Sequence, residues 1–115
     1  MARVLIVEDS EDSRDALRIL LELEGHDVCV AGSGEEAVQS VIAASPDWAL
    51  IDIGLPDMDG YETARRIRAA RGAVRLVALT GYNRPQDRDR ALAEGFDAHL
   101  AKPVDPARLF TILGG

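Results

Sequence analysis

Apolar residues recur along the chain in two alternating patterns. Short runs of five to eight residues are largely apolar, and the segments between them place apolar residues three or four positions apart. The first pattern is typical of buried β-strands and the second of amphipathic helices. The runs predict five strands, at residues 3–7, 26–31, 47–53, 73–80 and 97–101. A helix is predicted after each of them.

Residues at the ends of these segments support the predicted helices. Four side chains suited to N-capping stand where a helix would begin: Ser10, Ser33, Asp59 and Asp105. Glu36 follows Ser33 at the spacing of a capping box. Pro85 suits the first turn of a helix, and Gly25 and Gly95 suit the residue after the last turn.

The order of the elements predicts the fold class. The runs at 3–7, 47–53 and 73–80 are apolar at almost every position, as in strands covered on both faces. Strands that alternate with helices form parallel sheets through right-handed crossovers. We therefore expect an α/β fold, a doubly wound five-stranded parallel sheet with five helices, in one domain spanning residues 1–115.

Charge and composition narrow the classes of function. The formal net charge of −7 argues against direct nucleic-acid binding. No apolar run approaches the roughly 20 residues of a membrane span, so no membrane contact is expected. The single cysteine, Cys29, cannot form an internal disulfide, which favours a cytoplasmic location. The charge is uneven, at −11 over residues 1–60 and +4 over 61–115, and Lys102 is the only lysine.

Polar side chains gather at the carboxyl ends of the predicted strands, where sheets of this class bind ligands. These side chains are Glu8, Asp9, Asp52, Thr80 and Lys102. Each alone has an ordinary explanation as a capping, turn or surface residue, but their shared edge favours one site. Three crowded carboxylates repel one another, and a divalent cation together with Lys102 would balance their charge. An all-oxygen ligand set selects Mg²⁺.

Such a site suits phosphoryl transfer. A metal ion, an ammonium group and the Thr80 hydroxyl would surround the oxygens of a phosphoryl group. A carboxylate can itself be the nucleophile and form an aspartyl phosphate. Asp52, which ends a buried apolar strand, is the candidate nucleophile.

Four segments, "VLIVED", "LIDIGLPDMDGYE", "VALTG" and "AHLAKPVD", resemble in order the motif blocks of the receiver domain of two-component response regulators. The resemblance covers essentially the whole chain and implies a flavodoxin-like strand order, 2-1-3-4-5. It implies that Asp52 accepts a phosphoryl group from a histidine kinase or a histidine phosphotransfer domain. Phosphorylation would then switch a surface that binds a downstream partner, so the domain would be a signalling switch rather than an enzyme.

The resemblance also implies individual roles. The expected Mg²⁺ ligands are Glu8, Asp9, Asp52 and the backbone carbonyl of Gly54. Thr80 resembles the switch hydroxyl, Lys102 the lysine that contacts the phosphoryl group, and the bond before Pro103 is expected to be cis. Gly54 and Tyr82 flank the site, and we expect them to influence water access and the lifetime of the phosphoryl bond.

The sequence departs from the family's commonest pattern at two positions. The acidic pair is Glu8-Asp9 rather than two aspartates, and His99 stands where tyrosine or phenylalanine is usual. A partly buried His99 with satisfied hydrogen bonds is expected. The segment 78–109 is similar to receivers attached to hybrid histidine kinases, which suggests an excised or terminal receiver domain. Any kinase activity would then belong to a separate domain.

Three alternatives remain open. Gly32, Gly34 and Ala37 match a dinucleotide-binding pattern, but Glu35 and Glu36 would repel a pyrophosphate at that helix start. A Mg²⁺-dependent phosphatase with an aspartyl nucleophile shares the acids, but Gly54 stands where its second acid is usual. An interaction module that never takes phosphate would leave the acid, threonine and lysine set without a role. A lasting phosphorylated state favours a receiver, and steady ester turnover favours a phosphatase.

Overall fold

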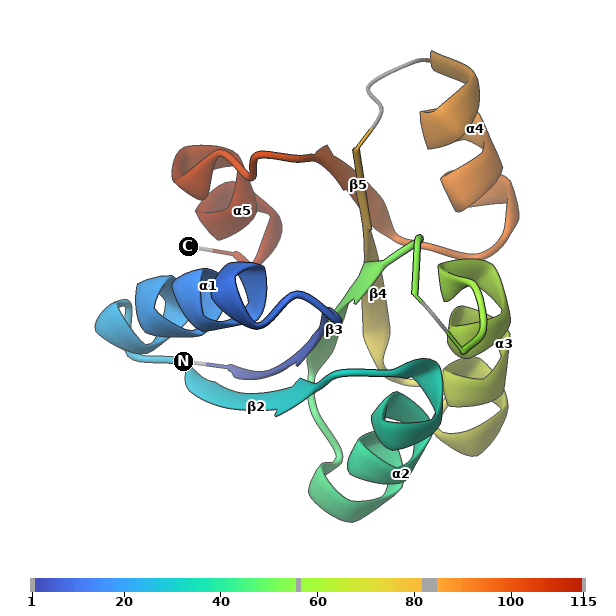
Figure 1. The fold of residues 1–115 in the computed structure, drawn as a ribbon, viewed down its shortest axis with the longest axis horizontal. Helices are drawn as coiled ribbons and strands as arrows, with labels where there is room; N and C mark the ends of the chain where they lie inside the picture. Colours follow the sequence, from blue (N-terminus) through green and yellow to red (C-terminus); the bar gives the residue numbers. More distant parts are fainter. Residues whose placement is uncertain (1, 56, 82–84, 115) are drawn as a thin grey trace.

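The computed structural model describes residues 2–55, 57–81 and 85–114. Strands and helices alternate along this part of the chain (Figure 1). The strands are β1 (Arg3–Val7), β2 (Asp27–Ala31), β3 (Trp48–Asp52), β4 (Arg75–Thr80) and β5 (Ala98–Ala101). The helices are α1 (Glu11–Leu23), α2 (Gly34–Ala44), α3 (Gly60–Ala70), α4 (Pro85–Ala93) and α5 (Pro106–Ile112). Each strand lies within two residues of its predicted bounds.

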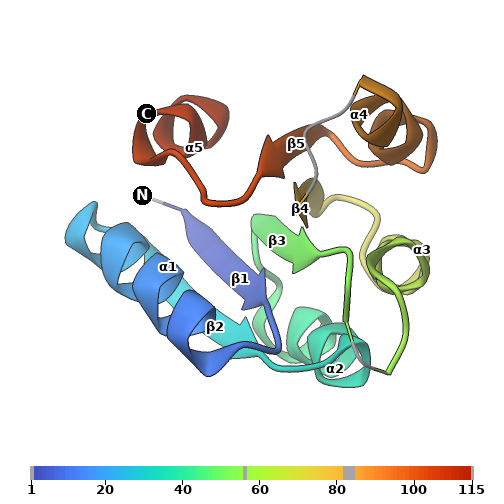
Figure 2. The same cartoon turned by 45° about the horizontal axis from the view of Figure 1, so that its top comes forward.

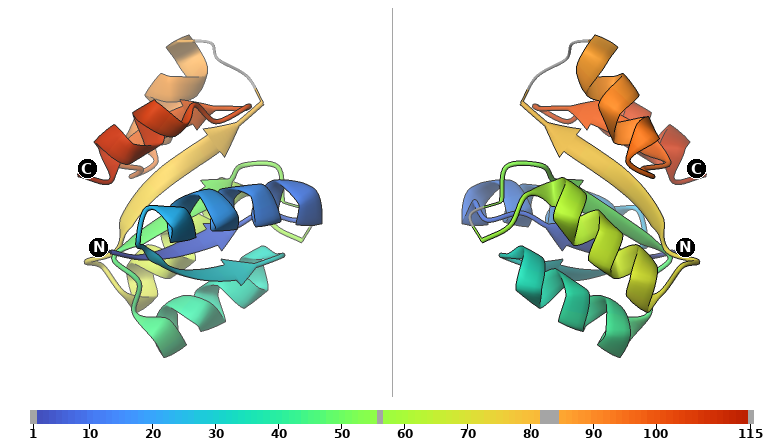
Figure 3. Two further views of the ribbon diagram at one scale, coloured as in Figure 1. Left: turned by 90° about the vertical axis from the view of Figure 1, so that its left-hand side faces the viewer. Right: turned by 90° about the vertical axis from the view of Figure 1, so that its right-hand side faces the viewer.

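The strands form one parallel sheet in the order β2-β1-β3-β4-β5, which confirms the implied flavodoxin-like topology. Helices α1 and α5 cover one face of the sheet, and α2, α3 and α4 cover the other (Figure 3). Strand β3 runs between β1 and β4 (Figure 2), so its carboxyl end lies at the centre of the sheet edge.

Alternate residues of the central strands enter two separate cores. In β1, Val4 and Ile6 pack beneath α1 and α5, while Leu5 and Val7 pack beneath α2, α3 and α4. All four are fully buried. A strand covered on both faces has no solvent-facing side, which is why its sequence is continuously apolar.

The predicted helix caps are present, with one difference. The side chains of Ser10, Ser33, Asp59 and Asp105 each accept a hydrogen bond from a backbone N–H in the first turn that follows. A capping box also requires Glu36 to accept a hydrogen bond from the Ser33 N–H, and this part of the prediction is wrong. The Glu36 carboxylate accepts instead from the N–H of Gly32, at 3.2 Å. Within the described segments, no helix is long and apolar enough to cross a membrane.

Candidate functional site

Three strand ends bring Glu8, Asp52 and Lys102 together at the carboxyl edge of the sheet. The residues follow β1, end β3 and follow β5. The Lys102 Nζ lies 2.6 Å from Glu8 Oε2 and 3.0 Å from Asp52 Oδ2, so the only lysine of the chain bridges two carboxylates. These contacts span 94 and 50 residues of sequence.

The two bridged carboxylates are buried. Glu8 is 1% exposed and Asp52 is 8% exposed, while the Lys102 side chain is 31% exposed. Burial raises the pKa of Glu8, and the hydrogen bond from Lys102 offsets this only in part. Burial also opposes the charge of Lys102, but its hydrogen bonds to Glu8 and Asp52 outweigh that effect and raise its pKa. One ammonium group thus faces two carboxyl groups, and its single positive charge can offset only one of two carboxylate charges.

A third carboxylate completes an all-oxygen cluster. Glu8, Asp9 and Asp52 each present a carboxylate oxygen, and these oxygens lie within 4.8 Å of one another. Asp9 is exposed, so the cluster opens to solvent on that side. Hard divalent cations prefer oxygen ligands, and a second cation would neutralise the charge that Lys102 leaves. The residues present therefore fit Mg²⁺.

Gly54 orients the Asp52 carboxylate. Its backbone N–H donates to Asp52 Oδ1 at 3.0 Å, while the other oxygen, Oδ2, accepts from Lys102. A Cβ added at Gly54 would lie 3.7 Å from Asp52 Oδ1, an ordinary contact. The Gly54 carbonyl as a metal ligand stays a prediction.

Thr80 ends β4 beside these groups and is 9% exposed. Its carbonyl accepts a 2.7 Å hydrogen bond from the backbone N–H of Lys102, which fixes the end of β5 against that of β4. The Lys102–Pro103 bond is cis, as the resemblance implied. Tyr82 lies outside the described residues, and its influence on the site stays a prediction.

His99 differs from what the sequence led us to expect. It lies on β5 and is partly buried, but its Nε2 is buried without a hydrogen-bond partner in the structure as described. The expectation of a satisfied histidine is therefore wrong. Burial lowers the pKa of His99; among the charges around it, Asp87 opposes this and Arg108 and Arg88 add to it. Whether such a nitrogen finds a partner depends on packing, which one sequence does not reveal.

Asp57 is a residue that the sequence did not single out. Its carboxylate accepts hydrogen bonds from the N–H groups of Gly34 and Glu35, at 2.9 and 3.0 Å. The dinucleotide-binding alternative placed a pyrophosphate at this start of α2. Because the chain's own carboxylate takes these two donors, the structure gives that alternative no support.

Comparisons with known proteins agree with this architecture. The family profile described as the response regulator receiver domain matches residues 4–114. An uncharacterized 14.6 kDa protein in the sodA1 3′ region of Leptolyngbya boryana is 40% identical over 112 residues, which cover 96% of this chain and 86% of that protein. The transcriptional regulatory protein TrcR of Mycobacterium tuberculosis is 35% identical over 98% of this chain but only 44% of its own length.

Solved structures show the same fold. A CheY-like response regulator receiver domain protein of Methanospirillum hungatei superposes with a TM-score of 0.89 at 32% identity, over 98% of this chain and 90% of that one. The chemotaxis protein CheY4 of Vibrio cholerae gives a TM-score of 0.90 at 30% identity, over 98% and 96%. This chain spans less than half the length of TrcR, so the activity of that whole protein does not transfer to it.

Proposed function

Because this chain belongs to the response regulator receiver domain family of two-component signalling, we propose that Asp52 is its phosphoacceptor. The donor would be a phosphohistidine on a histidine kinase or a histidine phosphotransfer domain. The observation that carries the proposal is the position of Lys102 Nζ between Glu8 Oε2 and Asp52 Oδ2. A cation held this close to a carboxylate nucleophile is suited to neutralise the oxygens of an incoming phosphoryl group.

In the proposed transfer, a carboxylate oxygen of Asp52 forms a bond to phosphorus as the phosphorus–nitrogen bond of the phosphohistidine breaks. The electron pair of that bond stays on the imidazole nitrogen. The Gly54 N–H keeps one Asp52 oxygen oriented, at 3.0 Å, through the step. Lys102, already shared between two carboxylates, turns toward the phosphoryl oxygens while Glu8 limits how far it moves.

We assign the metal site to Glu8, Asp9, Asp52 and the Gly54 carbonyl, and the metal to Mg²⁺. When bound, Mg²⁺ would supply positive charge beside the phosphoryl oxygens. Support comes from the oxygen cluster within 4.8 Å and from the negative charge that Lys102 leaves uncompensated.

The consequence of phosphorylation would be a switch. We propose that the Thr80 hydroxyl turns toward the new phosphoryl group. The surface formed by α4 and β5 would then change and alter the binding of a partner. Residues 1–115 would act as one receiver unit in the cytoplasm and would not turn over a separate substrate. The free Cys29 thiol, suited to a reducing compartment, supports that location.

The test is intact-mass spectrometry after incubation with Mg²⁺ and acetyl phosphate. We expect the wild-type protein to gain one phosphoryl group, and Asp52→Asn or wild type in EDTA to gain none. Asp12→Asn, which removes an exposed acid outside the cluster, is the matched control and should gain it. Labelling of Asp52→Asn would contradict the assignment, and continuous hydrolysis without a phosphorylated species would favour the phosphatase alternative.

A further inference from the structure

The loop between β3 and α3 touches α2 at its tip. Residues 53–55 leave the sheet edge, and residues 57–59 pass the start of α2 and lead into α3 (Figure 2). At the tip, Asp57 Oδ1 accepts from the Gly34 N–H and Oδ2 from the Glu35 N–H. Both oxygens of the Asp57 carboxylate thus accept hydrogen bonds from the start of α2, whose two donors lie 23 and 22 residues earlier in the chain.

These bonds complete the start of α2. The first N–H groups of a helix have no partner within it. Ser33 Oγ accepts from Glu36 N, which leaves Gly34 and Glu35 to Asp57. Hydrogen bonding, first of all from the Gly34 N–H, lowers the pKa of Asp57, so its charged form is the one the contact favours.

The same contact is also closely packed. A Cβ at Gly34 would lie 2.5 Å from Met58 Cγ of the loop and 2.6 Å from Thr63 Oγ1 of α3, so a glycine at this position lets both side chains approach closely. The two ends of the loop also lie close to each other, where Ile53 meets Gly60. Gly60 donates to the Ile53 carbonyl at 2.9 Å, and a Cβ there would lie 2.7 Å from Ile53 Cα.

Between these two anchors lies Gly54, three residues before Asp57. Its N–H orients Asp52, and its carbonyl is a proposed Mg²⁺ ligand. We propose that Asp57 is a positioning residue for the phosphoacceptor site: by fixing the loop tip on α2, it sets where Gly54 lies against Asp52. This inference rests on the proposed function, because it concerns the same site. Residues that orient a metal ligand commonly change metal affinity by tenfold or more.

The experiment compares Asp57→Ala with Ser33→Ala. Ser33→Ala also removes a cap from the start of α2, but the hydrogen bond that it removes lies within that helix start rather than between α2 and the loop, so it controls for loss of helix capping. Two readouts are needed: the Mg²⁺ dissociation constant by calorimetry, and exchange of the Gly54 amide hydrogen by NMR. Phosphorylation by acetyl phosphate is followed over a series of Mg²⁺ concentrations.

We expect Asp57→Ala to weaken Mg²⁺ binding about tenfold and to speed exchange of the Gly54 amide. The Mg²⁺ concentration for half-maximal phosphorylation should rise by the same factor, while the rate at saturating Mg²⁺ changes less. Asp57→Asn keeps one acceptor oxygen, so its Mg²⁺ affinity should lie between those of the wild type and Asp57→Ala. It provides a milder variant if the alanine protein is unstable.

Equal Mg²⁺ affinity and equal Gly54 exchange in Asp57→Ala and Ser33→Ala would overturn the inference. That result would leave the proposed function intact if the wild-type protein still takes the phosphoryl group. A wild-type protein that binds Mg²⁺, with the expected Asp57 effect, but takes no phosphoryl group from acetyl phosphate or from a phosphohistidine donor supports the positioning role and overturns the proposed chemistry. A wild-type protein that neither binds Mg²⁺ nor takes a phosphoryl group overturns both the positioning role and the proposed function.

Discussion

At the residue scale, Lys102 is the side chain that joins the two buried carboxylates of the site, Glu8 and Asp52. The chain has 13 basic residues, and this is the one that is not arginine. An ammonium group is compact enough to lie between Glu8 Oε2 and Asp52 Oδ2, and its flexible stem lets it move to a new partner. A planar guanidinium forms broader, fixed bidentate pairs and does not make that exchange as readily.

The first prediction concerns Lys102→Met. Without Mg²⁺, two buried carboxylates would lose their counter-charge, a kind of change that costs roughly 3–5 kcal/mol in a dry interior. Because Lys102 is about one-third exposed, we expect the free energy of unfolding to fall by about 2 kcal/mol. Mg²⁺ should recover most of this loss. Urea denaturation with and without Mg²⁺ measures both effects.

Lys102→Arg is the control for this variant. It keeps the positive charge, so its metal-free stability should stay near that of the wild type, while phosphorylation slows because the guanidinium fits the site less well. If Lys102→Met proves as stable as the wild type in EDTA, Lys102 does not offset the charges of Glu8 and Asp52.

The sequence predicts some of these residues and not others, for a physical reason. Glu8, Asp52 and Lys102 could be placed together because the carboxyl ends of parallel strands meet at one edge of a sheet. The family resemblance then supplied the strand order that periodicity leaves open. The contact of Asp57 with α2 depends on the path of an irregular loop, which follows no periodic pattern. The free Nε2 of His99 likewise depends on packing around β5.

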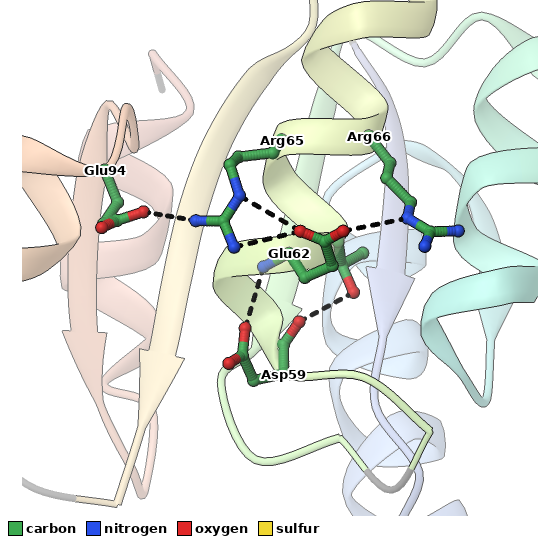
Figure 4. A network of polar contacts seen from close by, with 6 residues as sticks. Asp59, Glu62, Arg65, Arg66 and Glu94 are labelled. Atoms are coloured by element: carbon green, nitrogen blue, oxygen red, sulfur yellow. Dashed lines mark hydrogen bonds and ion pairs between the residues drawn. The ribbon is translucent and has the colours of Figure 1, made fainter.

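At the scale of elements, α4 buries little of its surface against the rest of the molecule. Ala91 is its only buried residue among those described, whereas α3 buries Tyr61, Ala64 and Ile67 among others. Arg65 Nη1 lies 2.7 Å from Glu94 Oε2 just beyond the end of α4 (Figure 4). The Arg90 guanidinium lies 4.1 Å from the centre of the Tyr61 ring. Because few of its side chains are buried, we expect α4 to open locally at a lower free-energy cost than α3.

The prediction at this scale is that Arg65 restrains α4 without stabilising the whole fold. Arg65 is about half exposed, and an ion pair of this kind is worth roughly 0.2–1 kcal/mol. We expect Arg65→Ala to speed amide exchange in α4 severalfold, with a change in the global unfolding free energy of less than about 1 kcal/mol. Hydrogen–deuterium exchange with peptide-level resolution measures the first effect, and urea denaturation the second.

The neighbouring Arg66 offers a matched control. It is equally exposed and also pairs with Glu62, but its other contact is Glu35 on α2 rather than α4 (Figure 4 shows its pair with Glu62). Arg66→Ala should leave exchange in α4 unchanged. Equal exchange in the two variants would mean that the Arg65–Glu94 pair does not restrain α4.

At the scale of the whole molecule, the site links parts of the chain that are far apart in sequence. Glu8 and Asp9 follow β1, and Asp52 ends β3, so folding alone brings their oxygens within 4.8 Å. The unfolded chain scatters these ligands over more than forty residues. A metal that binds the native arrangement and not the unfolded chain must stabilise the fold.

The final prediction separates this linkage from general screening of an acidic protein. At ten times its dissociation constant, Mg²⁺ should stabilise the wild type by about 1.4 kcal/mol, which raises the melting temperature by roughly 5 °C in a domain of this size. Sodium chloride at the same ionic strength should give a much smaller rise. Asp9→Asn should lose the Mg²⁺ response, whereas Asp12→Asn, with the same net charge, should keep it. Equal responses of the two variants would mean that Mg²⁺ acts on the overall charge of −7 rather than at the sheet edge, because only Asp9 belongs to the cluster.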